Sequence, residues 1–467
     1  MSLSSEILIV MKLYFIILSF GVCLNCDSQT IPIFKLLRYD EDYSYLKNDT
    51  VKNYWYKKTK FLSLSKSKET YLSFGGEYRY QYFYFKNEGW GHEPKDNDGY
   101  LLSRFLGHAD LHAGKFFRTF VQLQSSLANG KINSSPVDEN QVDLHQLFAD
   151  GVISISKQKS LITRIGRQEL LYGSQRLVST RDGPNSKQSF DAARIIYNSR
   201  QFRTDGFFSA YVISKRAIFD DEFNSNIKFW GGYAVINKIP FLKNIDLYYL
   251  GLWKRVARFD DGLTKENRHS IGTRIWGKSK NWEHDFETVY QWGKFGAGNI
   301  SAWTVSSNTT YTFSALKSAP SINLKADLIS GDKNYNDERL NTFNPLFPRG
   351  AYFGYAALIG PANLLDIHPS FNLDLLKTLR LTFDYDVFWR YSTHDGIYGP
   401  SGALLYSGKN IKSKYIGDQY SVFLLYAPSS FLYFRGEFTW FNSGDFLKEA
   451  SPGKDIIFTG VTMQFKF

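Results

Sequence analysis

Residues 457–467 read IFTGVTMQFKF, and along this stretch apolar side chains alternate with polar or small ones. Alternation with a period of two is typical of a β-strand with one apolar face and one wetter face. A strand that runs to Phe467, with aromatic side chains at its end, is what a closed outer-membrane barrel needs at its seam, because lipid tolerates no open sheet edge. An ordinary edge strand of a soluble β-sandwich is the alternative interpretation.

Alternation of the same kind recurs along the chain after Tyr71. Residues 71–86 and 379–391 each combine a row of mainly aromatic and aliphatic side chains with a second row that carries acids and bases. In a sandwich, the second face meets bulk water and a long aromatic face has to find a partner sheet. In a membrane barrel, the aromatic face meets lipid and the charged face lines a water-filled lumen. The number and length of these segments favour the barrel.

The expected fold is therefore an all-β, transmembrane, antiparallel β-barrel. Residues beyond Tyr71 would accommodate roughly 16–18 tilted strands of about 10 residues each, and we expect 18. The composition agrees, since 17% of the residues are aromatic, with 31 Tyr and 39 Phe. Such residues suit strands and the aromatic girdles at membrane surfaces. A mean hydropathy of −0.32 argues against a helical membrane protein.

The N-terminal region has the features of an export signal. Lys12 precedes an apolar run over residues 13–26 that is too short for a spanning helix and fits a signal-peptide core, with Met11 as an alternative start. Cys23 and Cys26 both lie in this signal, which excludes a disulfide scaffold and a cysteine nucleophile from the mature chain. Three parts are expected: a signal peptide over residues 1–28, a periplasmic or lumenal extension over 29–70, and the barrel over 71–467.

The net charge of +11 comes from 56 basic and 45 acidic residues. The two kinds are mixed along the whole length and form no dense basic run, so nucleic acid is not an expected partner. A basic balance of this kind can instead attract anionic solutes to a pore.

The densest polar stretch is RIGRQELLYGSQRL at residues 164–177, followed by RDGPN at 181–185. On these residues the chain resembles the alginate-export family of bacterial outer-membrane proteins. The resemblance implies an 18-stranded, monomeric, porin-like barrel. In the best-known members an electropositive lumen passes an anionic uronate polysaccharide outwards, but the branch resembled here is broader and need not handle alginate. Further stretches that carry the resemblance lie, in the expected order, at 38–42, 108–112, 137–141, 144–146 and 343–348.

Arginines are the candidate residues of a permeation pathway. A guanidinium stays charged and grips carboxylates in a bidentate manner, which suits a passage for anions. The alternative is that these arginines pair with acids and brace the wall of the lumen. Arg164 and Arg167 cannot share a face of a regular strand, so we expect a bulge at Gly166 or an inward loop. The lumen candidates are Arg79, Arg104, Arg118, Arg164, Arg167, Arg176, Arg181 and Arg194, with the acids Glu77, Asp110 and Glu169.

Two segments raise the question of a metal ion. His108, Asp110 and His112 share one strand face, but residues two apart on a strand lie about 6.5–7 Å apart. A lumen histidine usually bonds to a neighbour instead, so we expect no metal and no cofactor there. Residues 332–337 begin like a calcium loop but lack Gly at the sixth position and Glu at the twelfth, which excludes an EF-hand. The sequence still allows extracellular loops to bind calcium in another geometry.

No catalytic motif stands out. The sequence has no Gly-x-Ser-x-Gly elbow, no P-loop and no His-Glu-x-x-His motif, and we expect no enzyme. The expected function is an outer-membrane, porin-like channel of the alginate-export type that passes anionic polysaccharide or small anionic solutes by diffusion through an arginine-lined lumen. The alternatives are a small-solute porin working inwards, a non-conducting adhesin or surface-binding barrel, and an outer-membrane hydrolase. Expected partners are the lipids and lipopolysaccharide of a Gram-negative outer membrane and the barrel-insertion machinery.

Overall fold

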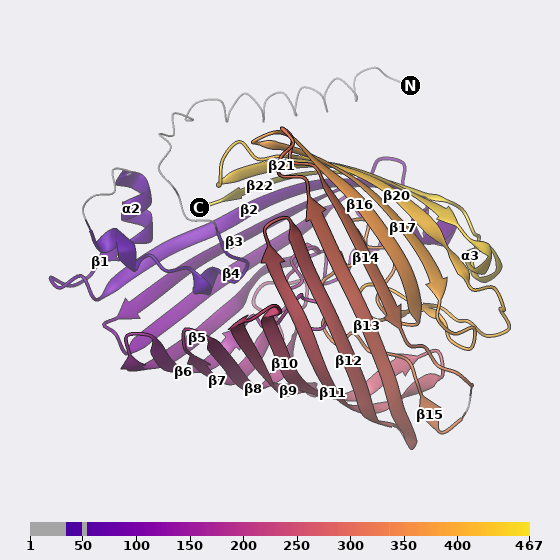
Figure 1. Cartoon of the computed structure of the whole chain (residues 1–467), viewed down its shortest axis with the longest axis horizontal. Coiled ribbons are helices and arrows are strands. Elements are labelled where there is room, and N and C mark those ends of the chain that lie inside the picture. The colour runs from indigo at the N-terminus through magenta and orange to yellow at the C-terminus, as the bar shows by residue number, and fades with distance from the viewer. Residues whose placement is uncertain (1–33, 49–53, 336) are drawn as a thin grey trace. The chain divides into compact units, whose positions relative to one another are not determined.

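The structure, a computed structural model, describes residues 34–48, 54–335 and 337–467 (Figure 1). Its main element is one sheet of twenty strands. Two of them, β1 (Leu62–Ser63) and β15 (Arg339–Leu340), have only two residues each, and the other eighteen form the wall of a barrel. The first long strand, β2 (Tyr71–Lys86), pairs with the last, β22 (Ile456–Lys466), so the sheet closes on itself. The expected all-β class and the expected 18 strands are confirmed.

The remaining wall strands pair antiparallel with their neighbours in chain order. They are β3 (Tyr100–Ala113), β4 (Phe117–Asn129), β5 (Asn140–Ser156), β6 (Lys159–Gln168), β7 (Phe190–Asn198), β8 (Phe202–Ile213), β9 (Glu222–Ile239), β10 (Lys243–Phe259), β11 (Gly262–Ser279), β12 (Trp282–Phe295), β13 (Gly298–Thr312), β14 (Ser321–Ile329), β16 (Leu364–Leu376), β17 (Leu379–Arg390), β20 (Tyr415–Tyr426) and β21 (Leu432–Ser443).

Alternation along each strand sorts side chains between the outside and the inside of the wall. In β22, Val461 is 57% exposed whereas the next residue, Thr462, is fully buried. Apolar side chains such as Ile165 and Phe208 cover the outside, where they meet lipid in a membrane barrel. Among the described residues, no helix is both long enough and apolar enough to cross a membrane.

The two ends of the barrel differ in the length of their connections. One end carries mainly short turns, such as 157–158 between β5 and β6 and 377–378 between β16 and β17. The other end carries the long loops, above all 169–189, 330–363 and 391–414. Short periplasmic turns and longer extracellular loops are the rule in outer-membrane barrels, so the long loops mark the extracellular end. These connections also contain η3 (Glu88–Gly91), β18 (Ile397–Tyr398), β19 (Leu404–Tyr406) and α3 (Asp445–Ala450).

Two of the long loops fold back into the barrel. Loop 169–189 and loop 330–363 meet at Val178 and Phe347, which form a parallel bridge. Phe347 also packs edge-on against Phe190 of β7, with ring centroids 5.0 Å apart. The apolar core therefore includes loop residues as well as inward-facing wall residues.

The described N-terminal segment lies against the end of the barrel at which the last strand, β22, finishes. It contains η1 (Arg38–Asp40), η2 (Ser44–Lys47) and α2 (Tyr54–Lys60). Arg38 donates hydrogen bonds to the carbonyl oxygens of Gly76 and Phe467, at 2.9 and 2.8 Å. The expected signal peptide lies outside the described residues, and the part boundaries at 28 and 70 stay predictions.

The expected bulge at Gly166 is wrong. β6 pairs with β5 and with β7 across Gly166 without a change of register. Gly166 instead adopts a φ of +133°, and a Cβ added there would lie 2.2 Å from the carbonyl oxygen of Leu147. Since the strand stays regular, Arg164 and Arg167 lie on opposite faces of the wall.

Candidate permeation pathway

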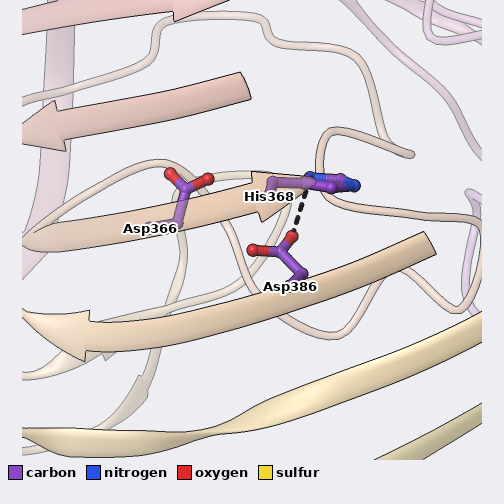
Figure 2. Close-up of side chains that lie close together, drawn as sticks. All are labelled: Asp366, His368 and Asp386. Carbon is purple, nitrogen blue, oxygen red and sulfur yellow. Dashed lines mark ion pairs between the residues drawn. The ribbon is translucent and has the colours of Figure 1, made fainter. Parts of the chain in front are cut away.

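One side of the inner wall is acidic. Asp327 on β14 and Asp366 on β16 occupy directly opposed positions in neighbouring strands. Beside them, the His368 ring lies between two carboxylates of β17. Its Nε2 lies 2.6 Å from Asp384, and its Nδ1 lies 2.9 Å from Asp386 (Figure 2). The inward-facing carboxylates of this side are Asp246, Asp285, Glu287, Asp327, Asp366, Asp384 and Asp386. Arg274 pairs with Asp246 and Asp285, and Lys325 pairs with Asp327.

Sequence reasoning did not select this acidic side as a site. The pair Asp384 and Asp386 was visible as a polar row opposite aromatic residues, and Asp366 and His368 have the same spacing of two. That spacing is the signal that an inward-facing cluster would leave in the sequence.

The candidate arginines on β3 and β4 are paired with carboxylates. Arg104 lies 2.5 Å from Glu77 of β2 and 2.7 Å from Asp182 of loop 169–189, and it is fully buried. Arg118 donates to both carboxylate oxygens of Asp110, each at 2.7 Å. These pairs neutralise the charge of each guanidinium within the wall.

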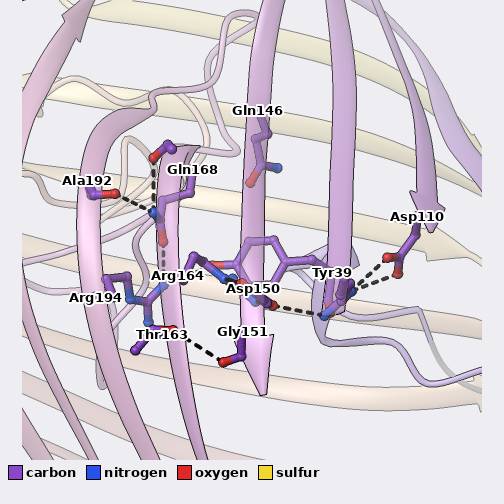
Figure 3. A network of polar contacts seen from close by, with 12 residues as sticks. Tyr39, Asp110, Gln146, Asp150, Gly151, Thr163, Arg164, Gln168, Ala192 and Arg194 are labelled. Atoms are coloured by element: carbon purple, nitrogen blue, oxygen red, sulfur yellow. Dashed lines mark hydrogen bonds and ion pairs between the residues drawn. The ribbon is translucent and has the colours of Figure 1, made fainter. Parts of the chain in front are cut away.

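A second group of pairs surrounds Tyr39, which enters from the N-terminal segment (Figure 3). The Arg164 guanidinium is bonded to both oxygens of Asp150, at 2.7 and 2.8 Å, and lies 4.2 Å from the centroid of the Tyr39 ring. Arg194 forms an ion pair with Asp205 and a hydrogen bond with Gln168. The Tyr39 hydroxyl donates to the carbonyl oxygen of Glu169 at 2.8 Å, so the network ties the N-terminal segment to loop 169–189.

Glu169 itself is enclosed by basic groups. Its Oε1 lies 2.6 Å from Lys187 Nζ and 2.9 Å from His145 Nε2, and the carboxylate is almost completely buried. The three side chains join β5 to both ends of loop 169–189. Glu169 therefore holds the loop at its base.

Arg79 holds the same loop without the help of an acid. Its two terminal nitrogens donate to the carbonyl oxygens of Asp182 and Pro184, both at 2.7 Å. Among the described residues, no carboxylate lies within ion-pair distance of Arg79. Backbone dipoles hold its guanidinium against the loop, and the carboxylates of Asp182 and Glu77 act on its charge from a longer distance.

The two candidate arginines within loop 169–189 differ in their surroundings, because the carboxylates of Asp327, Glu287 and Asp285 act on the charge of Arg176. Arg176 Nη1 lies 3.8 Å from Glu287, at the long end of an ion pair. Arg181 donates to the Tyr211 hydroxyl at 3.1 Å and has no acidic partner in the described part of the chain. Arg181 is partly exposed, and its backbone has a φ of +52°.

Arg167 differs from the other candidates because it lies outside the barrel. It stands directly opposite Leu147, which is 44% exposed, and on the same face as Ile165. Its guanidinium pairs with Asp191 of β7, with Nε and Oδ1 2.9 Å apart. The expectation of a lumenal Arg167 is corrected here, because regular alternation puts 164 inside and 167 outside.

The three residues that the sequence suggested as possible metal ligands, His108, Asp110 and His112, do not point their ligand atoms at a common position. Asp110 is engaged by Arg118 and by His112, whose Nε2 lies 3.3 Å away, and the His108 ring stacks on Phe120. In loop 330–363, Asp332 accepts a hydrogen bond from the amide of Asn341 at 2.8 Å. Calcium binding by these loops stays a prediction.

Asp332 carries a shifted pKa. Burial, with the carboxylates of Asp395 and Asp261 adding to it, raises the pKa of Asp332 from 3.8 to about 7. The charged form is disfavoured because it loses water and gains negative neighbours. We therefore expect the docking of loop 330–363 to depend on pH near neutrality.

A closed 18-stranded barrel with an apolar outside, a charged inside and loops folded into its lumen defines a porin-like channel of the bacterial outer membrane. The profile of the alginate export family matches residues 70–455. The chain belongs to that family, and its place is the outer membrane of a Gram-negative bacterium.

Solved porin structures share this fold at low sequence identity. OccD3 (OpdP) of Pseudomonas aeruginosa superposes with a TM-score of 0.59 at 14% identity, covering 88% of this chain and 92% of that one. A BenF-like porin of Pseudomonas fluorescens gives 0.57 at 12% identity, covering 85% and 98%. OpdK of Pseudomonas aeruginosa, solved with vanillate, gives 0.55 at 12% identity, covering 87% and 99%. No curated protein sequence matches the chain.

Proposed function

We propose that the barrel is a passive diffusion channel for anionic solutes, either small carboxylates or an anionic polysaccharide, and that loop 169–189 forms its constriction. The observation that carries this proposal is the attachment of the loop to the inner wall through Arg79 and Arg104. A loop bound to the wall on the inside narrows the lumen at that depth. Its side chains are then the ones that a solute meets.

The charge on that loop favours anions. Arg181 is partly exposed and lacks an acidic partner among the described residues, and Arg79 lies directly behind the loop with no carboxylate at ion-pair distance in the described part of the chain. Rings of arginine in a narrow passage select for anions because they lower the free energy of a negative ion there. Arg104, Arg118, Arg164 and Arg194, which are bound to carboxylates, brace the wall instead.

The comparisons support an anionic solute class. Alginate, after which the family is named, is a polymer of uronates that carries one carboxylate per sugar. Vanillate, with which the OpdK structure was solved, is an aromatic carboxylate. Both classes expose the group that a guanidinium binds best.

The proposal extends to the surroundings of the barrel. The apolar outer surface would contact lipids and lipopolysaccharide, and the C-terminal strand with Phe467 would serve the barrel-insertion machinery as its recognition signal. We propose a monomer, since the barrel closes through β2 and β22 of the same chain.

Liposome swelling with solutes of graded size and charge tests the solute class. Liposomes that contain the purified barrel should swell faster in gluconate or glucuronate than in neutral sugars of equal size. Arg181→Ala should remove that difference, whereas Arg200→Ala, in the exposed turn between β7 and β8, should leave it unchanged. Equal swelling in charged and neutral solutes would contradict the proposal.

A second candidate is a surface-binding barrel that does not conduct. It is favoured by the apolar contact of Val178, Phe190 and Phe347, with which the two inward loops pack inside the barrel. Liposomes that do not swell and bilayers that show no channel openings would favour this candidate over the channel.

A further inference from the structure

We propose that Asp366, His368 and Asp386 form a binding site for one divalent transition cation, of the zinc, cobalt or nickel class, on the inner wall of the barrel. The three side chains come from two neighbouring strands, β16 and β17. One imidazole nitrogen and one oxygen from each carboxylate all lie within 4.8 Å of one another (Figure 2). Ligand atoms that share an ion at about 2.0–2.2 Å lie somewhat closer than this, so small side-chain rotations would complete the site.

Asp366, one of the two carboxylates of this cluster, lacks the partners that its burial demands. Asp366 is only 1% exposed, and neither of its oxygens has a hydrogen bond among the described residues. Neither oxygen of Asp386, which is fully buried, has a hydrogen bond there either, although its Oδ2 forms an ion pair with His368 Nδ1 at 2.9 Å. A buried carboxylate without a partner, such as Asp366, costs several kcal/mol, and a dication between Asp366 and Asp386 would offset that cost.

His368 is oriented as a metal ligand. Its Nε2 makes a 2.6 Å hydrogen bond with Asp384, on the side of the ring that faces away from Asp386. Its Nδ1 lies 2.9 Å from Asp386 but makes no hydrogen bond within the described part of the chain. Histidine ligands in metal sites typically donate one N–H to a carboxylate and coordinate through the other nitrogen. Asp384 would be that orienting carboxylate, and Nδ1 would bind the ion after losing its proton.

The nearest lysine compensates the cluster only in part, because the carboxylate closest to it is that of Asp327. Lys325 of β14 stands directly opposite His368, but its Nζ donates to the carbonyl oxygen of Tyr352 at 3.0 Å and lies 3.5 Å from Asp327. Around the ring of His368 there remain three carboxylates, from Asp366, Asp384 and Asp386, against one imidazole. This excess of negative charge favours a doubly charged ion.

The donor set indicates the kind of ion. One imidazole nitrogen and two carboxylate oxygens suit zinc, cobalt, nickel and copper, whereas calcium and magnesium prefer oxygen alone. Three protein ligands leave at least one position for water from the lumen. The site shares no residue with the anion pathway proposed above, and it lies on the carboxylate-rich side of the wall.

Metal binding to the folded, tag-free barrel in detergent tests the proposal. Equilibrium dialysis against Zn²⁺ or Co²⁺ should give one tightly held ion per chain, and bound Co²⁺ should show visible absorption. His368→Gln and Asp366→Asn should each weaken binding more than 10-fold, and Asp384→Asn should weaken it about 10–100-fold, as other orienting partners do. His284→Gln, on the outer face, and Asp374→Asn, in an exposed pair with Arg380, serve as controls and should bind like the wild type.

Folding of each variant is checked by its heat-dependent mobility in electrophoresis. Crystals of the wild type soaked in Zn²⁺ give a second measurement that requires no variant. An anomalous peak about 2.0–2.1 Å from His368 Nδ1 is expected. The absence of that peak, or unchanged affinity in His368→Gln, would overturn the proposal.

Discussion

Arg79 on the first wall strand holds Asp182 of loop 169–189 through its backbone, with Nη1 2.7 Å from the Asp182 carbonyl oxygen. A second bond of the same length reaches Pro184. Because both acceptors are backbone atoms, the attachment fixes the path of the loop. The loop in turn carries Arg181, so one wall arginine determines where another arginine stands in the lumen.

Loosening this attachment should widen the channel. In Arg79→Ala the loop loses two charge-assisted hydrogen bonds, each worth roughly 1.5–3 kcal/mol, and we expect a larger and noisier single-channel conductance. Arg79→Lys keeps the charge but cannot reach both carbonyl oxygens in the same fork geometry, so an intermediate conductance is expected. A conductance equal to that of the wild type in both variants would show that the loop is held by other contacts.

The buried pair of Arg104 and Glu77 should contribute to stability in a coupled way. Arg104→Met leaves Glu77 buried without its partner and should lower the free energy of unfolding by about 3–5 kcal/mol. The double variant with Glu77→Gln should recover a large part of that loss. Arg380→Ala, which breaks an exposed pair with Asp374, should cost less than about 1 kcal/mol. Urea unfolding of the barrel in lipid vesicles measures all three, and strictly additive losses would contradict the coupling.

Gly166 should not tolerate a side chain. Its φ of +133° and the carbonyl oxygen of Leu147 at 2.2 Å from an added Cβ predict that Gly166→Ala destabilises the barrel by about 1–3 kcal/mol. Gly206→Ala in β8 is the matched control, because an added Cβ there meets no atom within 4 Å. Equal stability of the two variants in the same unfolding assay would show that the strand relaxes freely at Gly166.

The docking of loop 330–363 should weaken as pH rises towards neutrality. The pKa of Asp332 is raised from 3.8 to about 7 in the folded protein, so the folded loop binds this proton more tightly than the unfolded chain does. The resulting stabilisation is complete below about pH 4 and is lost as pH rises through about 7. Hydrogen exchange of the loop amides, corrected for intrinsic rates, should therefore be faster at pH 8 than at pH 5.

Asp332→Asn should reduce that difference, because asparagine does not titrate; Asp395, whose pKa burial raises to about 6 and which accepts hydrogen bonds from Asp332 and Thr342, should account for the remainder. Asp98→Asn, at an exposed position in loop 87–99, should keep it. Equal protection of the wild-type loop at pH 5 and pH 8 would be inconsistent with a proton held by Asp332.

The sequence predicted the wall better than the interior. Alternation in residues 457–467 was enough for the closing strand, since the period of two is a local property of an extended chain. The same rule predicted that Arg164 and Arg167 cannot share a face of a regular strand. The strand is regular and contains no bulge, so they lie on opposite faces. The contact of Val178 with Phe347 joins loops about 170 residues apart, and nothing in the local pattern of either loop predicts it.

The sequence also did not predict which charged side chains pair, because pairing depends on contacts between distant parts of the chain. Arg118 and Asp110 pair because β3 and β4 have a particular register, and register depends on turns and on packing of the whole sheet. The site of Asp366, His368 and Asp386 needs the register of β16 and β17 as well. A sequence contains these side chains, but the strand pairing decides which of them meet.

The reversal potential of single channels in a salt gradient tests the central claim most directly. With the purified barrel in a planar bilayer, we expect discrete openings and a potential that shows anion preference. A charge 4 Å from an ion in water is worth about 1 kcal/mol, so Arg181→Ala should reduce the anion-to-cation permeability ratio about five-fold, and Arg167→Ala should leave it unchanged. Cation preference in the wild type, or bilayers that stay silent, would contradict an anion channel.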